Sequence, residues 1–209
     1  MQNARVAAVL MALAMLAACS SEPKKAEAPT VPAKPRETEA RTGREAFQRL
    51  YATARQWAAD ARPVRLESGA TNDANGHDGK AAIWRTQFAS AGRRGIEAFI
   101  WSGTSGPDAP ERGVSHGAED TWTPGNASTV PFDVNFLKVD SDGAVKTAEK
   151  HGGDKVLKSR PDTPVVYLLD WDMRKSELVW HVIYGRSRSD AALVVDVNAT
   201  TGEFLRVEK

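Results

Sequence analysis

The sequence contains a single cysteine among 209 residues, so no disulfide can form within one chain. It also lacks, before that cysteine, the roughly 20 apolar residues that a membrane-spanning helix needs. Lys and Arg number 28 and Asp and Glu 27, and without a basic excess we expect no nucleic-acid partner. The four histidines show no metal-ligand spacing. We therefore expect no metal and no cofactor, and a fold held together by its core.

The one cysteine lies in a distinctive setting near the start of the chain. Arg5 precedes an apolar run from Val6 to Met15, which is typical of a secretory signal peptide. The following Leu16-Ala17-Ala18-Cys19 resembles the lipobox of bacterial lipoproteins. The resemblance implies that residues 1–18 are removed, that the Cys19 sulfur takes a diacylglyceryl group, and that the new amino terminus receives an acyl chain such as palmitate.

The residue after the cysteine bears on where the anchored protein is sorted. Ser20 follows Cys19, in place of an aspartate, and this resembles the default outer-membrane signal of diderm bacteria. We therefore expect a protein of the cell envelope, held by lipid in the outer membrane and facing the periplasm.

Residues 19–41 are predicted to be a disordered tether. They contain four prolines among Lys, Glu, Ala and Thr, and no apolar periodicity. At ~3.1 Å per residue, the proline-rich stretch from Ser20 to Ala40 reaches at most roughly 65 Å. We divide the rest of the chain into a first unit at 42–139 and a second at 140–209.

The first unit is predicted to begin with an amphipathic helix. Thr42 and Glu45 have the spacing of a capping box, and Pro63 is expected to end the helix. The apolar residues at helical spacing are Phe47, Leu50, Tyr51, Ala54, Trp57, Ala58 and Ala61. Strands are expected at 64–66, 83–89, 96–101 and 130–139, with a long loop at 102–129.

The second unit repeats this order of elements. A helix is expected to begin at Ser141 and to stop at Gly152-Gly153. Strands are expected at 165–171, 178–184, 192–197 and 203–207. When the sequence is aligned with itself at an offset of 96 positions, Trp84 falls on Trp180. The alignment needs no gap across the predicted hairpin of each unit. This match favours a duplicated helix-then-sheet unit over chance similarity, although few residues are identical.

The second unit resembles the PepSY domain. The resemblance rests on the short helix, on the strand Leu178-Val-Trp-His-Val-Ile-Tyr184, and on Asp196 followed by the turn Thr201-Gly202. It covers roughly residues 141–209, and Ala199 and Thr200 lengthen the turn beyond the family pattern. The resemblance implies an α+β, cystatin-like fold and non-catalytic roles outside the cytoplasm, such as peptidase inhibition or partner binding.

Several chemical motifs are better explained without catalysis or metal binding. Gly113-Val-Ser-His-Gly117 matches the nucleophile elbow of hydrolases, but the surrounding glycines and prolines argue against the strand and helix which that elbow needs. Aspartates at 73–78 and 140–143 lack EF-hand spacing. His181 is expected to be hydrogen-bonded on the open face of its strand. Asp170 and Asp172 bracket Trp171, and a hairpin end explains them as well as an acid pair does.

We therefore expect no catalytic residue, and a non-catalytic module that binds or inhibits a protein or peptide partner. A structural subunit of an envelope assembly is one alternative, and an enzyme using Asp170 and Asp172 or the loop at 102–129 is another. Trp122 stands alone in that polar loop. It either folds back as a plug or is exposed as an anchor for the partner.

Overall fold

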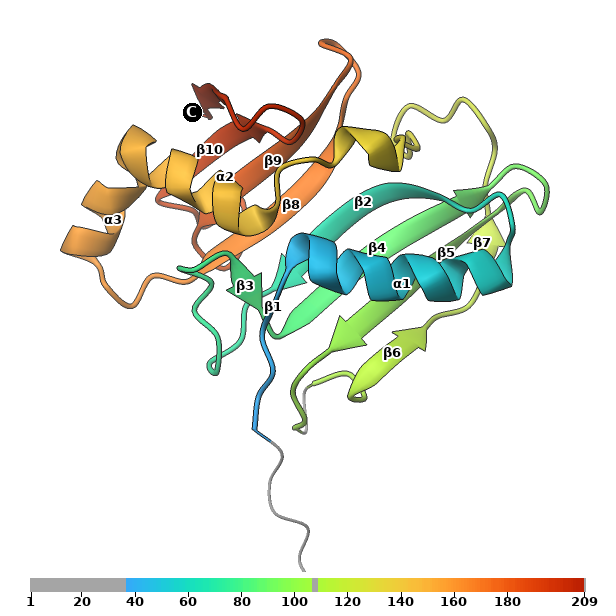
Figure 1. The fold of residues 1–209 in the computed structure, drawn as a ribbon, viewed down its shortest axis with the longest axis horizontal. Coiled ribbons are helices and arrows are strands. Elements are labelled where there is room, and N and C mark those ends of the chain that lie inside the picture. Colours follow the sequence, from blue (N-terminus) through green and yellow to red (C-terminus); the bar gives the residue numbers. More distant parts are fainter. Residues whose placement is uncertain (1–36, 107–108, 209) are drawn as a thin grey trace, which may run out of the picture. The chain divides into compact units, whose positions relative to one another are not determined.

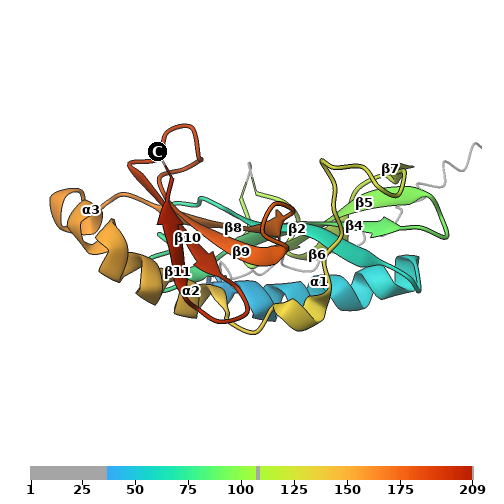
Figure 2. The ribbon, with the colours of Figure 1, turned by 90° about the horizontal axis from the view of Figure 1, so that it is seen from above.

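The computed structural model describes residues 37–106 and 109–208, so the predicted signal peptide, Cys19 and most of the tether lie outside the described residues. These described residues form one compact unit. Its main feature is a large antiparallel sheet with helices on one face (Figures 1 and 2), which is an α+β fold, as predicted. None of the helices in the described ranges is long and apolar enough to cross a membrane.

The sheet joins both predicted units edge to edge. Its strand order is β11-β10-β9-β8-β2-β4-β5-β6, and all neighbours are antiparallel. These strands are β2 (Arg62–Gly69), β4 (Ile83–Ser90), β5 (Gly95–Ser102), β6 (Gly113–His116), β8 (Val165–Asp172), β9 (Glu177–Tyr184), β10 (Leu193–Asn198) and β11 (Phe204–Val207). The short β7 (Asp120–Thr121) also pairs with β5. The first long strand of each half, β2 and β8, therefore lie side by side at the centre.

The helices cover one face of this sheet. They are α1 (Gly43–Trp57), α2 (Ser141–Ala148) and α3 (Asp154–Ser159). The predicted capping box is confirmed, because the Thr42 hydroxyl accepts from the Glu45 amide and the Glu45 carboxylate accepts from the Thr42 amide. The helix is shorter than predicted, however. Ala58 already has extended backbone angles, and a turn at 58–61 leads directly into β2.

The core lies between the helices and the sheet, around two tryptophans. Trp84 on β4 and Trp180 on β9 are both 0 % exposed, and their rings make an edge contact with centroids 6.3 Å apart. The indole N–H of Trp84 donates to the Arg41 carbonyl, and that of Trp180 to the Val139 carbonyl, both at 2.9 Å. Each carbonyl precedes the first residue of a helix by two positions. Each indole therefore fixes the chain just before a helix begins.

The two halves also share a strand register. In the first half, β4 and β5 pair Trp84 with Trp101 and Phe88 with Glu97. In the second, β9 and β10 pair Trp180 with Val197 and Tyr184 with Leu193. All four pairs obey the offset of 96 that the sequence comparison indicated. The helix starts meet as well, because the Gly43 amide donates to the Ser141 hydroxyl at 2.8 Å.

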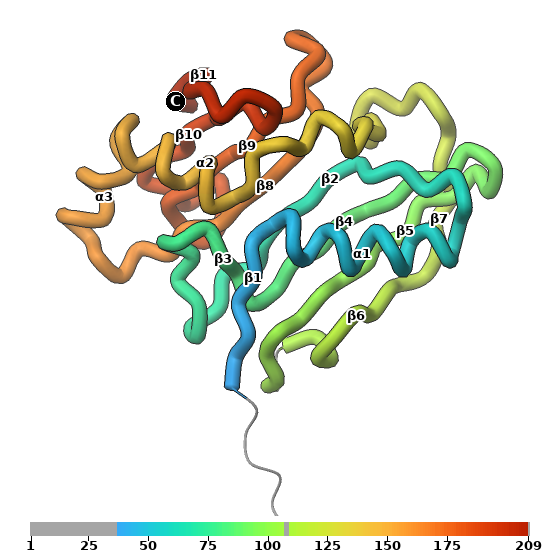
Figure 3. Tube along the Cα trace, viewed as in Figure 1, coloured from blue at the N-terminus to red at the C-terminus, as the bar shows by residue number. Residues whose placement is uncertain are grey.

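Residues 37–41, expected to belong to the tether, pack against the folded unit. The Glu39 amide donates to the Gly103 carbonyl at 2.9 Å, and the Thr38 hydroxyl contacts Asp73. Then β1 (Arg41–Thr42) pairs with β3 (Lys80–Ala81), beside which it runs in Figure 3. The backbone hydrogen bonds to Gly103 and to β3 offset the conformational entropy that residues 37–41 lose on ordering. The amino-acid composition of the tether gave no sign of these bonds.

The segment 130–139 was wrongly predicted to be a strand. It forms a single turn of 3₁₀ helix at Val134–Phe136, capped by the Asp133 side chain. Phe132 is buried, and its amide donates to the Pro63 carbonyl at 2.9 Å. Phe132 and Leu137 therefore join the core, whereas Phe136 is exposed, and the segment does not extend the sheet.

The second helix also differs at both ends. Asp140 is the N-cap, and the expected Ser141 is the first helical residue. Gly152 has a positive φ of 118°, but it does not stop the helical segment. An irregular turn at Glu149–Gly153 redirects the chain into α3. A glycine pair thus produces a kink where the pattern predicted an end.

Candidate functional site

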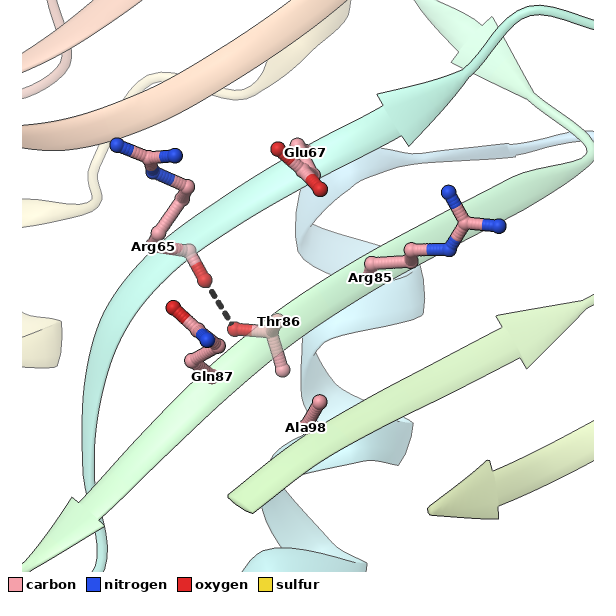
Figure 4. Close-up of a pocket in the computed structure, with 6 residues that line it drawn as sticks. All are labelled: Arg65, Glu67, Arg85, Thr86, Gln87 and Ala98. Carbon is pink, nitrogen blue, oxygen red and sulfur yellow. Dashed lines mark hydrogen bonds between the residues drawn. The ribbon is translucent and has the colours of Figure 1, made fainter. Parts of the chain in front are cut away.

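The face of the sheet opposite the helices carries most of its charged side chains. Side chains alternate along a strand, so the residues that do not enter the core stand on this second face. They include Arg65, Glu67, Arg85, Gln87, Asp170, His181, Asp196 and Arg206. Figure 4 looks onto this open face, with helix α1 behind the strands.

Three adjoining hollows form a groove across the open face. The first is lined by Arg65, Glu67, Arg85, Thr86, Gln87 and Ala98. The second shares Arg65 and Gln87 and adds Val64, Ala127, Ser128, Val130, Asp170 and Trp171. The third shares Ala127 and Trp171 and adds Asp172, Met173, Arg174 and Arg206. We call these three hollows together the sheet groove.

A buried ionic network lies beside the groove, centred on His181 of β9. Its Nδ1 lies 2.5 Å from Oδ1 of Asp196 on β10, and its Nε2 lies 3.1 Å from Oδ1 of Asp170 on β8. Asp196 is opposite His181 in the strand register, and so is Leu168, two residues from Asp170. The ring is 5 % exposed and Asp196 is 0 % exposed. Three neighbouring strands are thus tied together by one imidazole.

The carboxylates determine the charge of this imidazole. Burial by itself disfavours the charged ring, but hydrogen bonds to Asp170 and Asp196 and their negative charges raise the pKa of His181 to about 9. In the same way, burial opposes ionisation of Asp170, yet His181, Arg65 and Arg188 hold its pKa below the usual value. At neutral pH the network therefore contains an imidazolium between two carboxylates.

Two arginines complete the network from the C-terminal part of the chain. Arg206 on β11 lies 2.7 Å from Oδ2 of Asp196, and Arg188 lies 2.7 Å from Oε1 of Glu208. Arg188 is also 2.7 Å from the His181 ring, but a doubly protonated ring cannot accept, so Glu208 is the acceptor that holds it. These contacts fasten the last strand to the middle of the sheet.

The same cluster offers ligand atoms of a kind that metals bind. Atoms of His181, Asp196 and Glu208 lie within 4.8 Å of one another. However, guanidinium groups of Arg188 and Arg206 already contact these carboxylates, and a further cation would have to displace them. We therefore assign the cluster to an ion-pair network.

Sequence reasoning identified part of this network. His181 was expected to be hydrogen-bonded on the open face, and it is. Asp170 and Asp172 share one face of β8, but they have different partners: Asp172 accepts from the backbone amides of Arg174 and Lys175 in the hairpin turn. Asp196 could have been found from its register opposite His181, whereas nothing in the sequence signalled Glu208.

The other two singled-out residues lie elsewhere. Ser115 lies in β6, so the expectation that no strand forms around it was wrong, although residues 117–122 after it contain no helix. Trp122 is 6 % exposed, packs against Val64 and Ala89, and donates its indole N–H to the Thr129 hydroxyl at 2.8 Å. Of the two alternatives, the structure shows the plug. A partner cannot reach this indole unless the loop moves.

Comparison with known proteins establishes a shared fold only. No family model and no curated protein matches the sequence. Among solved structures, a crystal structure of a lipoprotein candidate from Clostridium difficile 630 matches with a TM-score of 0.52 at 13% sequence identity. The match covers 78% of this chain and 91% of that one. The arrangement of sheet and helices described above therefore occurs in another chain of very different sequence.

Proposed function

We propose that this chain is a lipid-anchored protein of the cell envelope and acts there as a non-catalytic binding module for a protein or peptide partner. The observation that carries the proposal is the sheet groove: one face of the sheet is covered by helices, and the other presents a hollow, charged surface. Such a groove suits recognition of an extended chain by its side chains, because the backbone groups of the strands beneath it are already paired within the sheet.

Anchoring is supported by the lipobox-like Leu16-Ala17-Ala18-Cys19 and by the lipoprotein assignment of the structural neighbour. Sorting to the outer membrane, facing the periplasm, is supported by Ser20. In this arrangement the predicted tether would let the folded unit meet partners away from the membrane surface.

We also propose that the two halves are duplicated, PepSY-like units. The support is the common offset of 96 in two hairpins and the equivalent indole contacts before α1 and α2. A duplication that joins through β2 and β8 doubles the width of the open face. A broad face gives room for a groove that a single small sheet lacks.

Replacement of Cys19 by serine tests the anchor. We expect Cys19→Ser to accumulate as uncleaved precursor and to incorporate no labelled fatty acid, because serine supplies no sulfur for the diacylglyceryl group. Metabolic labelling followed by gel analysis measures both effects, with the wild-type chain as control. Undiminished labelling of the variant would rule out the lipid anchor at this residue.

A bulky side chain in the groove tests the binding function. Ala98 lines the groove on β5, and Ala52 is exposed on α1 on the other side of the sheet. We expect purified mature Ala98→Trp to recover at least about tenfold less partner from envelope extracts than wild type, and the matched Ala52→Trp to recover as much as wild type. Equal recovery by both variants, at unchanged melting temperature, would refute the role of the groove.

A further inference from the structure

We infer that the sheet groove takes a peptide segment in which acidic residues flank an apolar one. This inference rests on the proposed binding function and names the chemistry of the partner. Two observations support it. Some charged side chains of the groove are ion-paired within the chain and others are not, and apolar side chains lie between the charged ones.

The acidic side chains of the groove are mostly engaged. Asp170 is bonded to His181, and Asp172 accepts two backbone amides and lies 3.6 Å from Arg206. Glu67 is the one groove carboxylate with no cation within ion-pair distance among the described residues. The anions of the groove are therefore largely unavailable to a partner.

Four arginines line the groove, and two of them, Arg85 and Arg174, have no ion-pair partner among the described residues, whereas Arg65 and Arg206 are paired with aspartates. No carboxylate of the described residues lies within ion-pair distance of Arg85 or Arg174, and the nearest to Arg65 is Asp170 at 3.8 Å. Figure 4 shows Arg65 and Arg85 on the open face with Glu67 between them. Two guanidinium groups without an ion pair, against one such carboxylate, favour an anionic partner, and each guanidinium fits a carboxylate in a two-point contact.

Apolar side chains lie between these charges. Arg65 and Arg85 line the first hollow, and Arg174 lines the third. Val64 and Ala127 line the second hollow, and Met173, which is 55 % exposed, borders the third. A chain lying along the groove would thus meet cations, then the aliphatic side chains of Val64 and Ala127 and the thioether of Met173, then a further cation. That order defines the acidic, apolar, acidic pattern of the partner.

The span of the groove favours a peptide over a small carboxylic acid. It runs from Ala98 on β5 across β4 and β2 to Trp171 on β8, which are neighbouring strands. Three spacings of about 4.8 Å give roughly 14 Å, the length of four or five extended residues. A flat anionic membrane fits less well, because Val64 lies inside a hollow that the loop residues Ala127 and Ser128 border.

Fluorescence anisotropy with labelled hexapeptides tests the inference on the full mature chain. The three probes carry a central pair of leucines flanked on each side by two glutamates, two glutamines or two lysines. At low salt we expect the glutamate peptide to bind at least about tenfold more tightly than the glutamine peptide, and the lysine peptide not to bind. We expect the preference to fall as salt screens the charges.

Arginine variants locate the binding. We expect Arg85→Gln and Arg174→Gln each to weaken glutamate-peptide binding about threefold, since exposed ion pairs are individually weak, and the double variant about tenfold. Arg49→Gln, an exposed arginine on α1, is the matched control and should change nothing. Equal affinity for all three peptides, or an equal effect of Arg49→Gln, would overturn the inference. So would arginine-dependent binding to phosphatidylglycerol vesicles in place of the peptide.

The two proposals can fail separately. If Ala98→Trp abolishes partner recovery while glutamate and glutamine peptides bind alike, the acidic preference is wrong and the binding face stands. If glutamate peptides bind through Arg85 and Arg174 but Ala98→Trp leaves partner recovery unchanged, the acidic preference stands and the proposed function is wrong.

Discussion

Replacing either Trp84 or Trp180 by alanine is expected to lower the free energy of unfolding by about 3–5 kcal/mol, the cost of deleting a large buried aromatic side chain. Both indoles are fully buried, and each donates a hydrogen bond that fixes the entry to a helix. Alanine removes the packing and also leaves a partly buried carbonyl without its donor. Urea unfolding of the two variants beside wild type measures the effect.

Trp171→Ala is the matched control for these variants. This tryptophan is only partly buried, and its main aromatic neighbour, Phe136, is 41 % exposed. We therefore expect a clearly smaller loss of stability, because less surface returns to water on unfolding. Comparable losses at Trp84 and Trp180 are what duplicated units predict. A near-wild-type melting temperature for one of the two would contradict their equivalence.

Stability is expected to fall as pH rises from about 6.5 to 9, because of His181. Its pKa is about 9 in the folded chain and near 6.5 when unfolded, so folding favours the protonated ring. The resulting stabilisation is complete below pH 6.5 and is lost as pH approaches 9. A shift of this size corresponds to roughly 3 kcal/mol at most. Urea unfolding at intervals between pH 6 and about 9.5 measures it.

Two histidine variants show whether His181 or another titrating group causes the pH dependence of stability. His181→Gln removes the charge and should abolish most of this pH dependence, whereas His151→Gln, an exposed histidine, should retain it. Burial raises the pKa values of Tyr167 and Tyr184, so neither tyrosine deprotonates in the folded chain within this range. Should His181→Gln fail to fold, NMR titration of the wild-type ring still decides the matter: a pKa near 6.5 would contradict the network.

The strands and the central tryptophans could be predicted from local pattern. Alternation of apolar and polar residues determines which side of a strand is buried, and it placed both Trp84 and Trp180 correctly. The capping box at Thr42 was also visible, because all its atoms come from four consecutive residues. Strand alternation and helix capping depend only on residues close together in the sequence, so both can be recognised without knowledge of the fold.

The contacts between segments far apart in the sequence could not be predicted. Pairing of β2 with β8 places Arg65 opposite Asp170, 105 positions further along the chain, and no periodicity signals such a contact. The groove depends on that pairing, and so does its border with loop residue Ala127. The apolar segment 130–139 has the pattern of a strand, but the nearby strands β2 and β8 already pair with a neighbour on each side, so the segment packs as a 3₁₀ turn.

The open face as a partner-binding surface is the central claim, and crosslinking in living cells tests it most directly. Cells expressing the wild-type chain, Ala98→Trp or Ala52→Trp at equal levels are treated with one crosslinker. The account predicts a discrete heavier species from wild type and from Ala52→Trp that is lost in Ala98→Trp. The same species at the same yield from all three chains, or its selective loss in Ala52→Trp, would contradict the account.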